Sequence, residues 1–397
     1  MKKIISLGGN YFQMTAVKAA KRLGYYVIDI DYLPDNPAHK FADEYYNIST
    51  LDKESVLKLA IEKNIDGIMA YASDVSAPTA AWVAEKLGLP TNPYDTVKLM
   101  TRKDLFHPFL KENGFNVPNN KTVKSEEEIY DFYYQNKKNI IIKPISASGS
   151  KGVTHIIDDK QIHNAYLEAM KYSREKSLVA EEFIQRKGFQ IAGDAFIVDG
   201  KIAFWGLANE HFNDSCNSLV PVGESFPVRL SASEIMRAKT EVQKAISLLN
   251  FKIGAINLDF MFDVDGNIFI IELGPRNGGN LITDAIKMST GIDLAEYTVK
   301  AALGEDISDL REKKWNKYIS SYIWHTEKPG IFESIDISEE LSRKIRLSDM
   351  FVERGQTIHK YINGAYGIGA ALIQYDSEEQ MIEMMQNMNK FYKIKMK

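Results

Sequence analysis

Two predicted strands, separated by a short turn, each carry one acid among apolar residues. Asp259 lies in residues 257–262, and Glu272 lies in residues 268–274, which run directly into Pro275 and Arg276. A carboxylate on a buried strand is costly unless a cation neutralises it. Magnesium binds carboxylate oxygens together with the phosphate oxygens of a substrate. We therefore place the chemistry of the chain at this pair of acids.

A second motif, upstream, has the composition of a phosphate-binding loop. Residues 140–144 form a β-branched run that ends in Lys143-Pro, and a loop rich in Gly and Ser follows over residues 145–153. Backbone N–H groups of such a loop can approach phosphate oxygens closely, and Lys143 and Lys151 would add positive charge. The alternative is a surface hairpin, but the Lys-Pro strand end directly before the loop favours phosphate binding. The spacing of a Walker A motif is absent.

Strands and helices alternate in the first part of the chain, which indicates a parallel, doubly wound sheet. A turn at Gly8-Gly9 precedes the first helix and could bind an anion. The third glycine of a dinucleotide fingerprint is missing, so that interpretation is weak. Strands are predicted over residues 3–9, 25–30 and 67–71. The first predicted helix ends near residue 23, and two further helices are predicted over residues 53–63 and 77–87.

The middle of the chain alternates less regularly and indicates an α+β domain. Helices are predicted over residues 95–113 and 125–138, the second with Ser125 as N-cap and Glu128 three positions later. Residues 189–200 read as a hairpin that turns at its Asp-Gly end.

Residues 207–227 are predicted to be a long polar loop, and loops of this length are often functional. We expect this loop to border a pocket for the acceptor substrate together with Arg229, Asn277 and Asn280, and Gly8 to Asn10 and Asp74 could supply a further wall. The alternative is that these residues form a surface loop with no role in binding.

The last part of the chain follows a charged linker over residues 306–317. Strands are predicted near residues 318–325 and 358–362, a Gly-rich strand over residues 364–373, and a helix over residues 377–388.

Composition excludes several classes of protein. The 397 residues are 45% apolar, which suits a packed protein of two or three domains. The net charge of -4 gives no general attraction to nucleic acid or anionic membranes. Cys216 is the only cysteine, so no intrachain disulfide framework exists. No apolar run approaches the roughly 20 residues of a membrane span, and we expect a cytoplasmic protein.

The order of these motifs resembles the ATP-grasp superfamily. A lysine at 103, Lys143-Pro with its Gly/Ser loop, the run Glu181-Glu-Phe-Ile, Asp259, and Glu272-Leu-Gly-Pro-Arg276 occur in the order that the superfamily shows. The likeness is closest to its carboxylate–amine ligases, such as amino-acid ligases, and extends to enzymes of the phosphoribosylglycinamide formyltransferase 2 and carbamoyl-phosphate synthase large-chain types.

The resemblance implies an ATP-grasp fold, α/β and α+β, in three domains. These are an N-terminal doubly wound domain over residues 1–99, an ATP-grasp domain over residues 100–305 with a mobile lid at about 115–183, and a small α+β C-terminal domain over residues 306–397.

The resemblance also implies a role for each matching residue. Asp259 and Glu272 would hold magnesium, or manganese as an alternative, and Arg276 and Lys151 would act on the reacting groups. Many relatives have Asn two positions after the second metal acid, where this chain has Gly274. The remaining matching residues would bind ATP, namely Lys103, Lys143, Ser148, Gly149, Ser150, Gly152, Glu181, Glu182, Phe183, Ile184 and Gln190.

The implied activity is an ATP-dependent carboxylate–amine ligase that forms an amide through an acyl phosphate. The alternatives are an enzyme that activates formate or bicarbonate, as purine-pathway and biotin-carboxylase-like relatives do, and an ATP-binding module without catalysis. The expected partners are small-molecule carboxylates and amines, with a homodimer allowed and neither nucleic acid nor membrane expected. The seven histidines are scattered, and we expect them to be structural or exposed.

Overall fold

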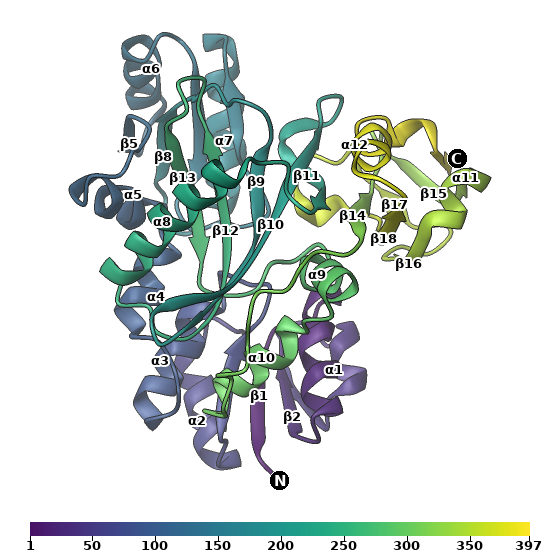
Figure 1. Cartoon of the computed structure of the whole chain (residues 1–397). Coiled ribbons are helices and arrows are strands. Elements are labelled where there is room, and N and C mark those ends of the chain that lie inside the picture. Colours follow the sequence, from purple (N-terminus) through teal and green to yellow (C-terminus); the bar gives the residue numbers. More distant parts are fainter.

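The computed structural model describes residues 1–397, and its N-terminal part is a parallel sheet with helices on both faces (Figure 1). The strand order is β3-β2-β1-β4, and every neighbouring pair is parallel. This confirms the doubly wound part of the predicted fold. The elements are β1 (Lys3–Leu7), α1 (Met14–Arg22), β2 (Tyr26–Ile30), β3 (Glu44–Tyr46), α2 (Lys53–Lys63), β4 (Gly67–Ala70) and α3 (Ala77–Leu87).

Two helices follow where a single helix over residues 95–113 was predicted. They are α4 (Tyr94–Met100) and α5 (Lys103–Glu112), so that prediction was wrong at its centre. The helix is interrupted at Thr101 and Arg102, because Arg102 adopts an extended backbone and the Lys103 N–H donates to Ile145 O, 3.2 Å away. The break therefore fixes the start of α5 against the loop after β6.

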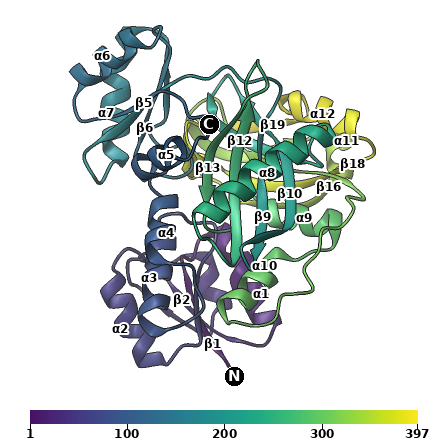
Figure 2. The same ribbon diagram turned by 60° about the vertical axis from the view of Figure 1, so that its left-hand side comes forward.

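A small four-stranded antiparallel lobe follows, at the upper left of Figure 2. Its strand order is β5-β8-β6-β7. The Ser125 side chain caps α6 by accepting from the Glu128 N–H, which confirms the predicted cap. The elements are β5 (Asn120–Val123), α6 (Glu126–Gln135), β6 (Ile140–Pro144), β7 (Thr154–Ile156), α7 (Ile162–Tyr172) and β8 (Leu178–Glu182).

An eight-stranded sheet forms the centre of the molecule, with strand order β13-β12-β9-β10-β11-β14-β18-β16. One face packs on α8 through residues such as Ile191, Leu258 and Phe260, and the opposite face carries Asp259. The strands are β9 (Gln190–Val198), β10 (Lys201–Asn213), β11 (Asn217–Phe226), β12 (Gly254–Phe262), β13 (Ile268–Gly274), β14 (Tyr318–Trp324), β16 (Ile345–Met350) and β18 (Gly369–Tyr375).

The predicted polar loop over residues 207–227 is instead most of a β-hairpin. Strands β10 and β11 pair antiparallel across it, with Glu210 opposite Glu224. The loop prediction was therefore wrong, because polar residues on these strands face the site and remove the apolar alternation by which a half-buried strand is recognised.

The C-terminal residues extend the central sheet through β14, β18 and β16 and add a second sheet of three strands, ordered β17-β15-β19. The strand predicted near residues 358–362 is only β17 (Thr357–Ile358), and the predicted strand over residues 364–373 begins with a 3-10 turn at Gly364–Tyr366. The other elements are α8 (Ala232–Leu248), α9 (Ile282–Thr290), α10 (Leu294–Ala302), β15 (Gly330–Ile337), α11 (Glu339–Lys344), α12 (Glu378–Gln386) and β19 (Tyr392–Met396). None of the helices has both the length and the apolar character that crossing a membrane requires.

Candidate active site

The two acids from which the sequence argument began face each other across a hairpin. Asp259 on β12 lies directly opposite Glu272 on β13. Neither carboxylate accepts a hydrogen bond from the protein, and the nearest cation, Lys103 Nζ, lies 3.9 Å from Glu272 Oε2. Burial raises the pKa of Asp259 to about 8, and the negative charge of Glu272 adds to the rise. A pair of carboxylates that the protein leaves so poorly compensated fits a divalent cation.

No group of three or more metal-ligating side chains occurs in the structure. Two carboxylates nevertheless agree with the way magnesium is bound beside nucleotides, since it keeps several waters and takes phosphate oxygens as further ligands. The donor set therefore fits magnesium held jointly by protein and substrate.

A cavity of about 330 Å³ brings most of the predicted site residues together. Its wall is formed by the small lobe, the central sheet and the start of α5. Of the predicted residues, it includes Lys103, Lys143, Ser148, Gly149, Ser150, Glu181, Glu182, Phe183, Ile184, Gln190, Asp259 and Glu272. Lys151, Gly152 and Arg276 do not line it.

The two lysines of the cavity are held in different ways. Lys103 Nζ donates to Ala147 O at 3.2 Å, which ties α5 to the Gly/Ser loop. Lys143 is buried, and its Nζ lies 2.6 Å from Glu181 Oε2. Both ammonium groups thus stand beside the loop that was predicted to bind phosphate.

Glu181 is the centre of a buried charge cluster and does not point freely into the cavity. His107 Nδ1 lies 2.7 Å from Glu181 Oε1, although the two atoms are not aligned for a hydrogen bond, so we treat this contact as electrostatic. Burial alone would raise the pKa of Glu181, but Lys143 and His107 outweigh burial and lower the pKa to about 2. Glu181 therefore stays ionised and holds Lys143 in place.

The end of β8 has features suited to the edge of a nucleobase. The backbone N–H of Ile184, which lines the cavity, donates to no acceptor in the protein. Phe183 beside it stacks on His155 with the ring centroids 4.0 Å apart and an angle of 14° between the ring planes. A flat base could therefore find a free donor and aromatic surface here. Sequence reasoning missed His155, which lines the cavity, because it is a lone histidine on a short strand.

The Gly/Ser loop contains residues in the left-handed region, with φ of 66° at Gly149, 54° at Ser150 and 71° at Gly152. A Cβ on Gly152 would lie 2.9 Å from Ala169 Cα, so this glycine allows close packing on α7. The loop is also tied to the far side of the cavity, since Ser150 Oγ donates to Leu219 O at 2.9 Å and the Gly364 N–H donates to Gly149 O at 2.9 Å. The structure thus holds the loop across the cavity.

Acids beyond the predicted pair lie on the same face of the sheet. Gln190 pairs with Glu210, and Glu210 pairs with Glu224 on the next strand. No ion pair compensates either glutamate. Burial raises the pKa of Glu210 well above its ordinary value and that of Glu224 to about 7. Because Glu210 and Glu224 were assigned to a loop, they could not be aligned with Asp259 from the sequence.

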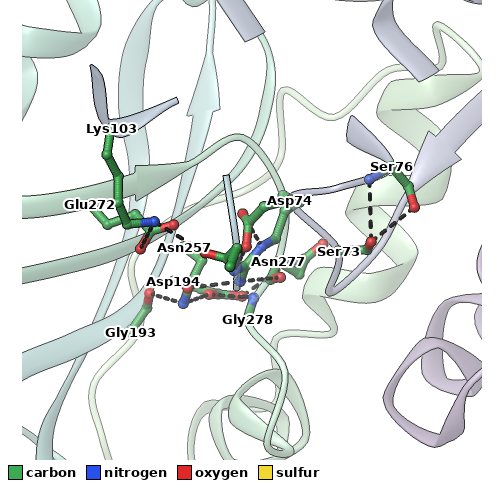
Figure 3. A network of polar contacts seen from close by, with 12 residues as sticks. Ser73, Asp74, Ser76, Lys103, Gly193, Asp194, Asn257, Glu272, Asn277 and Gly278 are labelled. Atoms are coloured by element: carbon green, nitrogen blue, oxygen red, sulfur yellow. Dashed lines mark hydrogen bonds and ion pairs between the residues drawn. The ribbon is translucent and has the colours of Figure 1, made fainter. Parts of the chain in front are cut away.

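Arg276 does not line the cavity and lies among protein acceptors. Figure 3 shows three residues that accept from it, Asp74, Asn257 and Asn277. Its Nε donates to Asp74 Oδ1 at 2.7 Å and its Nη2 to Asp74 Oδ2. Its Nη1 donates to Asn257 Oδ1 at 2.8 Å and to Asn277 O at 3.0 Å. Asp74 follows β4 of the N-terminal sheet, so this ion pair joins two parts of the molecule. Of the other residues that we expected near an acceptor pocket, Asn280 Nδ2 lies 3.4 Å from Glu224 Oε1.

Comparison with known proteins agrees with this geometry. Residues 101–280 match the family model described as "ATP-grasp domain". The chain thus contains an ATP-grasp domain over these residues. The chain is similar to carboxylate–amine ligases and related enzymes.

Among curated proteins, the chain is 24% identical over 319 residues to the carbamoyl phosphate synthase large chain of Halobacterium salinarum. The alignment covers 76% of this chain but 29% of that protein, so the chain spans less than a third of its relative's length.

Two solved structures share the fold over the whole chain. The L-amino acid ligase of Bacillus licheniformis has a TM-score of 0.82 and 22% identity, with 100% of this chain and 99% of that chain covered. The biotin carboxylase domain of the Hydrogenobacter thermophilus 2-oxoglutarate carboxylase, solved with MgADP and bicarbonate, has a TM-score of 0.76 and 19% identity, with 100% and 91% covered. These likenesses confirm the predicted ATP-grasp fold with its mixed sheets and helices.

Proposed function

We propose that this protein is an ATP-dependent ligase that joins a carboxylate to an amine through an acyl phosphate. One observation carries the proposal. A single cavity holds a free N–H donor beside an aromatic stack, two lysines with a Gly/Ser loop, and the Asp259–Glu272 pair. These are the groups that the base, the phosphates and the metal of a bound nucleotide require.

The proposed reaction has two steps. A carboxylate oxygen of the first substrate attacks the γ-phosphorus of ATP, and the bond to the β–γ bridging oxygen breaks, which releases ADP. The amine then attacks the carbonyl carbon of the acyl phosphate, the carbon–oxygen bond to phosphate breaks, and the nitrogen loses a proton. No side chain has to act as nucleophile in either step.

The protein's own contribution would be positioning and charge. Ile184 N–H would fix the adenine edge, and Lys103 and Lys143 would lie against the phosphates. The loop at Ser148 to Ser150, held by Leu219 and Gly364, would keep water from the acyl phosphate. Asp259 and Glu272 would hold magnesium, which when bound supplies positive charge to the phosphate oxygens.

The acids on β10 and β11 support an amine as the second substrate. Glu210 lines the cavity, Glu224 lies opposite it on the next strand, and neither has a cationic partner in the protein. An amine is protonated in neutral solution and must lose a proton before it attacks. Buried carboxylates would attract the ammonium form, and a carboxylate with a raised pKa is suited to accept that proton.

The direct test is ADP release with magnesium, ATP and pools of carboxylates and amines, with the product identified by mass spectrometry. The pools should include L-amino acids, formate and bicarbonate, because these separate amide formation from the alternative activations. We expect ADP release only when an acid and an amine are both present, and none from a Glu272→Gln variant. ADP release with bicarbonate or formate alone would redirect the assignment, and tight ATP binding with no release from any pool would contradict catalysis.

A further inference from the structure

Arg276 is held so completely by the protein that little of it remains for a substrate. A guanidinium has five N–H groups. Four of them donate within the protein, two to Asp74 and one each to Asn257 and Asn277. One N–H on Nη2 is left, so Arg276 in this arrangement can give a substrate anion a single hydrogen bond and not a two-point clamp.

Two of the three partners of Arg276, Asn257 and Asp74, are themselves held by further contacts. The Asn257 amide donates from Nδ2 to Gly193 O at 3.0 Å and to Asp194 Oδ1 at 3.1 Å, so its oxygen must face Arg276. Figure 3 shows Asn257, Asp194 and Gly278 in one network of hydrogen bonds.

On the other side of Arg276, Asp74 lies in a loop that is held by side-chain hydrogen bonds. Ser73 Oγ and Ser76 Oγ lie 2.9 Å apart, and Ser76 Oγ donates to Thr50 Oγ1 at 3.0 Å. Ala72, two residues before Asp74, has a φ of 50°, which a residue with a side chain adopts at a cost. Such strain persists where the surrounding contacts require it, and here it precedes the residue that reaches Arg276.

Gly274 is what allows Asp74 to reach this position. A Cβ at residue 274 would lie 2.6 Å from Asp74 Oδ1 and 3.3 Å from Arg276 Nε. The Asp74 carboxylate therefore fills the space into which a side chain at position 274 would project. Gly274 does not have a positive φ, so the close approach of Asp74, and not backbone strain, accounts for the glycine.

We propose that Asp74 is a positioning residue of the active site, contributed by the N-terminal sheet, and that it replaces the side chain missing at Gly274. Asp74 orients Arg276 so that its one free N–H serves the reacting anion. The N-terminal sheet must be seated against the β12–β13 hairpin for this to occur, so the orientation of Arg276 depends on contact between the two parts. The part of this inference that concerns the reacting anion rests on the proposed ligase activity.

A swap of side chains tests the structural half without any turnover. In Gly274→Asn alone, the new side chain meets Asp74, and we expect the melting temperature to fall by about 3 °C or more. In the double variant Asp74→Gly/Gly274→Asn the collision is gone, and the amide oxygen of the new side chain at position 274 replaces the Asp74 carboxylate beside Arg276. The melting temperature should therefore rise above that of Gly274→Asn. Gly279→Asn is the matched control, because a Cβ there has no atom closer than 3.9 Å.

The two outcomes of the swap are distinct. The single variant Asp74→Gly completes the comparison. If the losses of melting temperature in Gly274→Asn and Asp74→Gly add in the double variant, or if Gly274→Asn melts like wild type, the inference is overturned. If the single variant fails to fold, recovery of folded protein in the double variant supports the inference and failure of both contradicts it.

A second measurement tests positioning in the folded protein. In Asp74→Asn, amide hydrogen exchange in the segment from Gly274 to Gly279 should rise about tenfold, while the affinity for ADP with magnesium should stay within about twofold of wild type. Exposed Asp35→Asn is the control and should change neither. Unchanged exchange in this segment would contradict the inference.

With the acid found by ADP-release screening, Asp74→Asn should lower kcat about tenfold or more with the KM for ATP unchanged, and Asp74→Glu should recover part of the loss. A changed KM for ATP with unchanged kcat would contradict positioning of Arg276. If no acid is turned over, the ligase proposal fails while the swap and exchange results still decide the role of Asp74.

Discussion

The metal-free protein should become more stable when Asp259 is replaced by Asn. The Asp259 carboxylate accepts no hydrogen bond, and Glu272 stands directly opposite it on the neighbouring strand. Asn has nearly the same shape and removes one of the two facing charges. The substitution therefore relieves a repulsion without breaking a contact.

The size of the effect follows from the strand geometry. Side chains directly opposite each other on antiparallel strands lie about 5 Å apart. Two like charges at ~5 Å with an effective dielectric constant of ~20 repel by ~3 kcal/mol. Both side chains are partly exposed, Glu272 by 29%, and solvent weakens this repulsion. We therefore expect Asp259→Asn to raise the free energy of unfolding by about 2 kcal/mol at a pH where both groups are ionised in wild type.

The gain must depend on pH, with a definite sign. Burial raises the pKa of folded Asp259 to about 8, whereas an unfolded Asp titrates near ~3.9. The folded protein thus binds this proton more tightly than the unfolded chain does. Wild-type stability consequently falls as the pH rises from about 4 to about 8, and the Asn variant escapes that fall.

Scanning calorimetry in EDTA at pH 5 and pH 8 measures the prediction. The melting temperature of Asp259→Asn, relative to wild type, should be higher at pH 8 than at pH 5 by roughly 4 °C. Asp265→Asn, an exposed acid in the turn of the same hairpin, should show no such dependence. With saturating magnesium and ADP, wild type should melt at a higher temperature than Asp259→Asn, because wild type binds them better. An Asn variant that is less stable than wild type to the same degree at both pH values would refute the reasoning.

Three further predictions concern other parts of the site. Glu272→Gln should lower ADP release at least about 100-fold without lowering the melting temperature, measured by coupled assay and calorimetry, because it removes a metal ligand's charge. Lys143→Ala should weaken ATP binding about tenfold or more and also lower the melting temperature, because it leaves Glu181 buried without its cation; adding Glu181→Gln should restore the melting temperature but not the affinity. Gly152→Ala should destabilise the small lobe by about 1–3 kcal/mol, seen as faster amide exchange, and Gly149→Ala should cost less, because its Cβ has no neighbour closer than 3.9 Å.

The sequence predicted the elements whose side chains alternate between core and site. The β12–β13 hairpin was found because its apolar residues pack under α8 while Asp259 stands out on the other face. The phosphate loop was found because its composition is unusual and follows a β-branched strand. Order along the chain then indicated the ATP-grasp domain, and the fold brings most of these motifs to one cavity.

Features that depend on distant partners could not be predicted. Glu210 and Glu224 were assigned to a loop, since strands whose exposed face forms a polar site lack the alternation of a half-buried strand. Arg276 was expected to hold a substrate anion, and nothing near it in sequence reveals that Asp74, some two hundred residues earlier, accepts from two of its five N–H groups. The break between α4 and α5 likewise depends on a hydrogen bond from Lys103 to Ile145 O, which no local pattern encodes.

The transfer of labelled oxygen tests the central claim most directly. The carboxylate found by ADP-release screening would be prepared with ¹⁸O in both oxygens and incubated with ATP, magnesium and the amine. Phosphate released by wild-type protein should carry one ¹⁸O atom for each amide formed, because the carboxylate oxygen leaves with phosphate in the acyl-phosphate route. Amide formation with unlabelled phosphate would contradict that route and the roles assigned to the residues around Asp259 and Glu272.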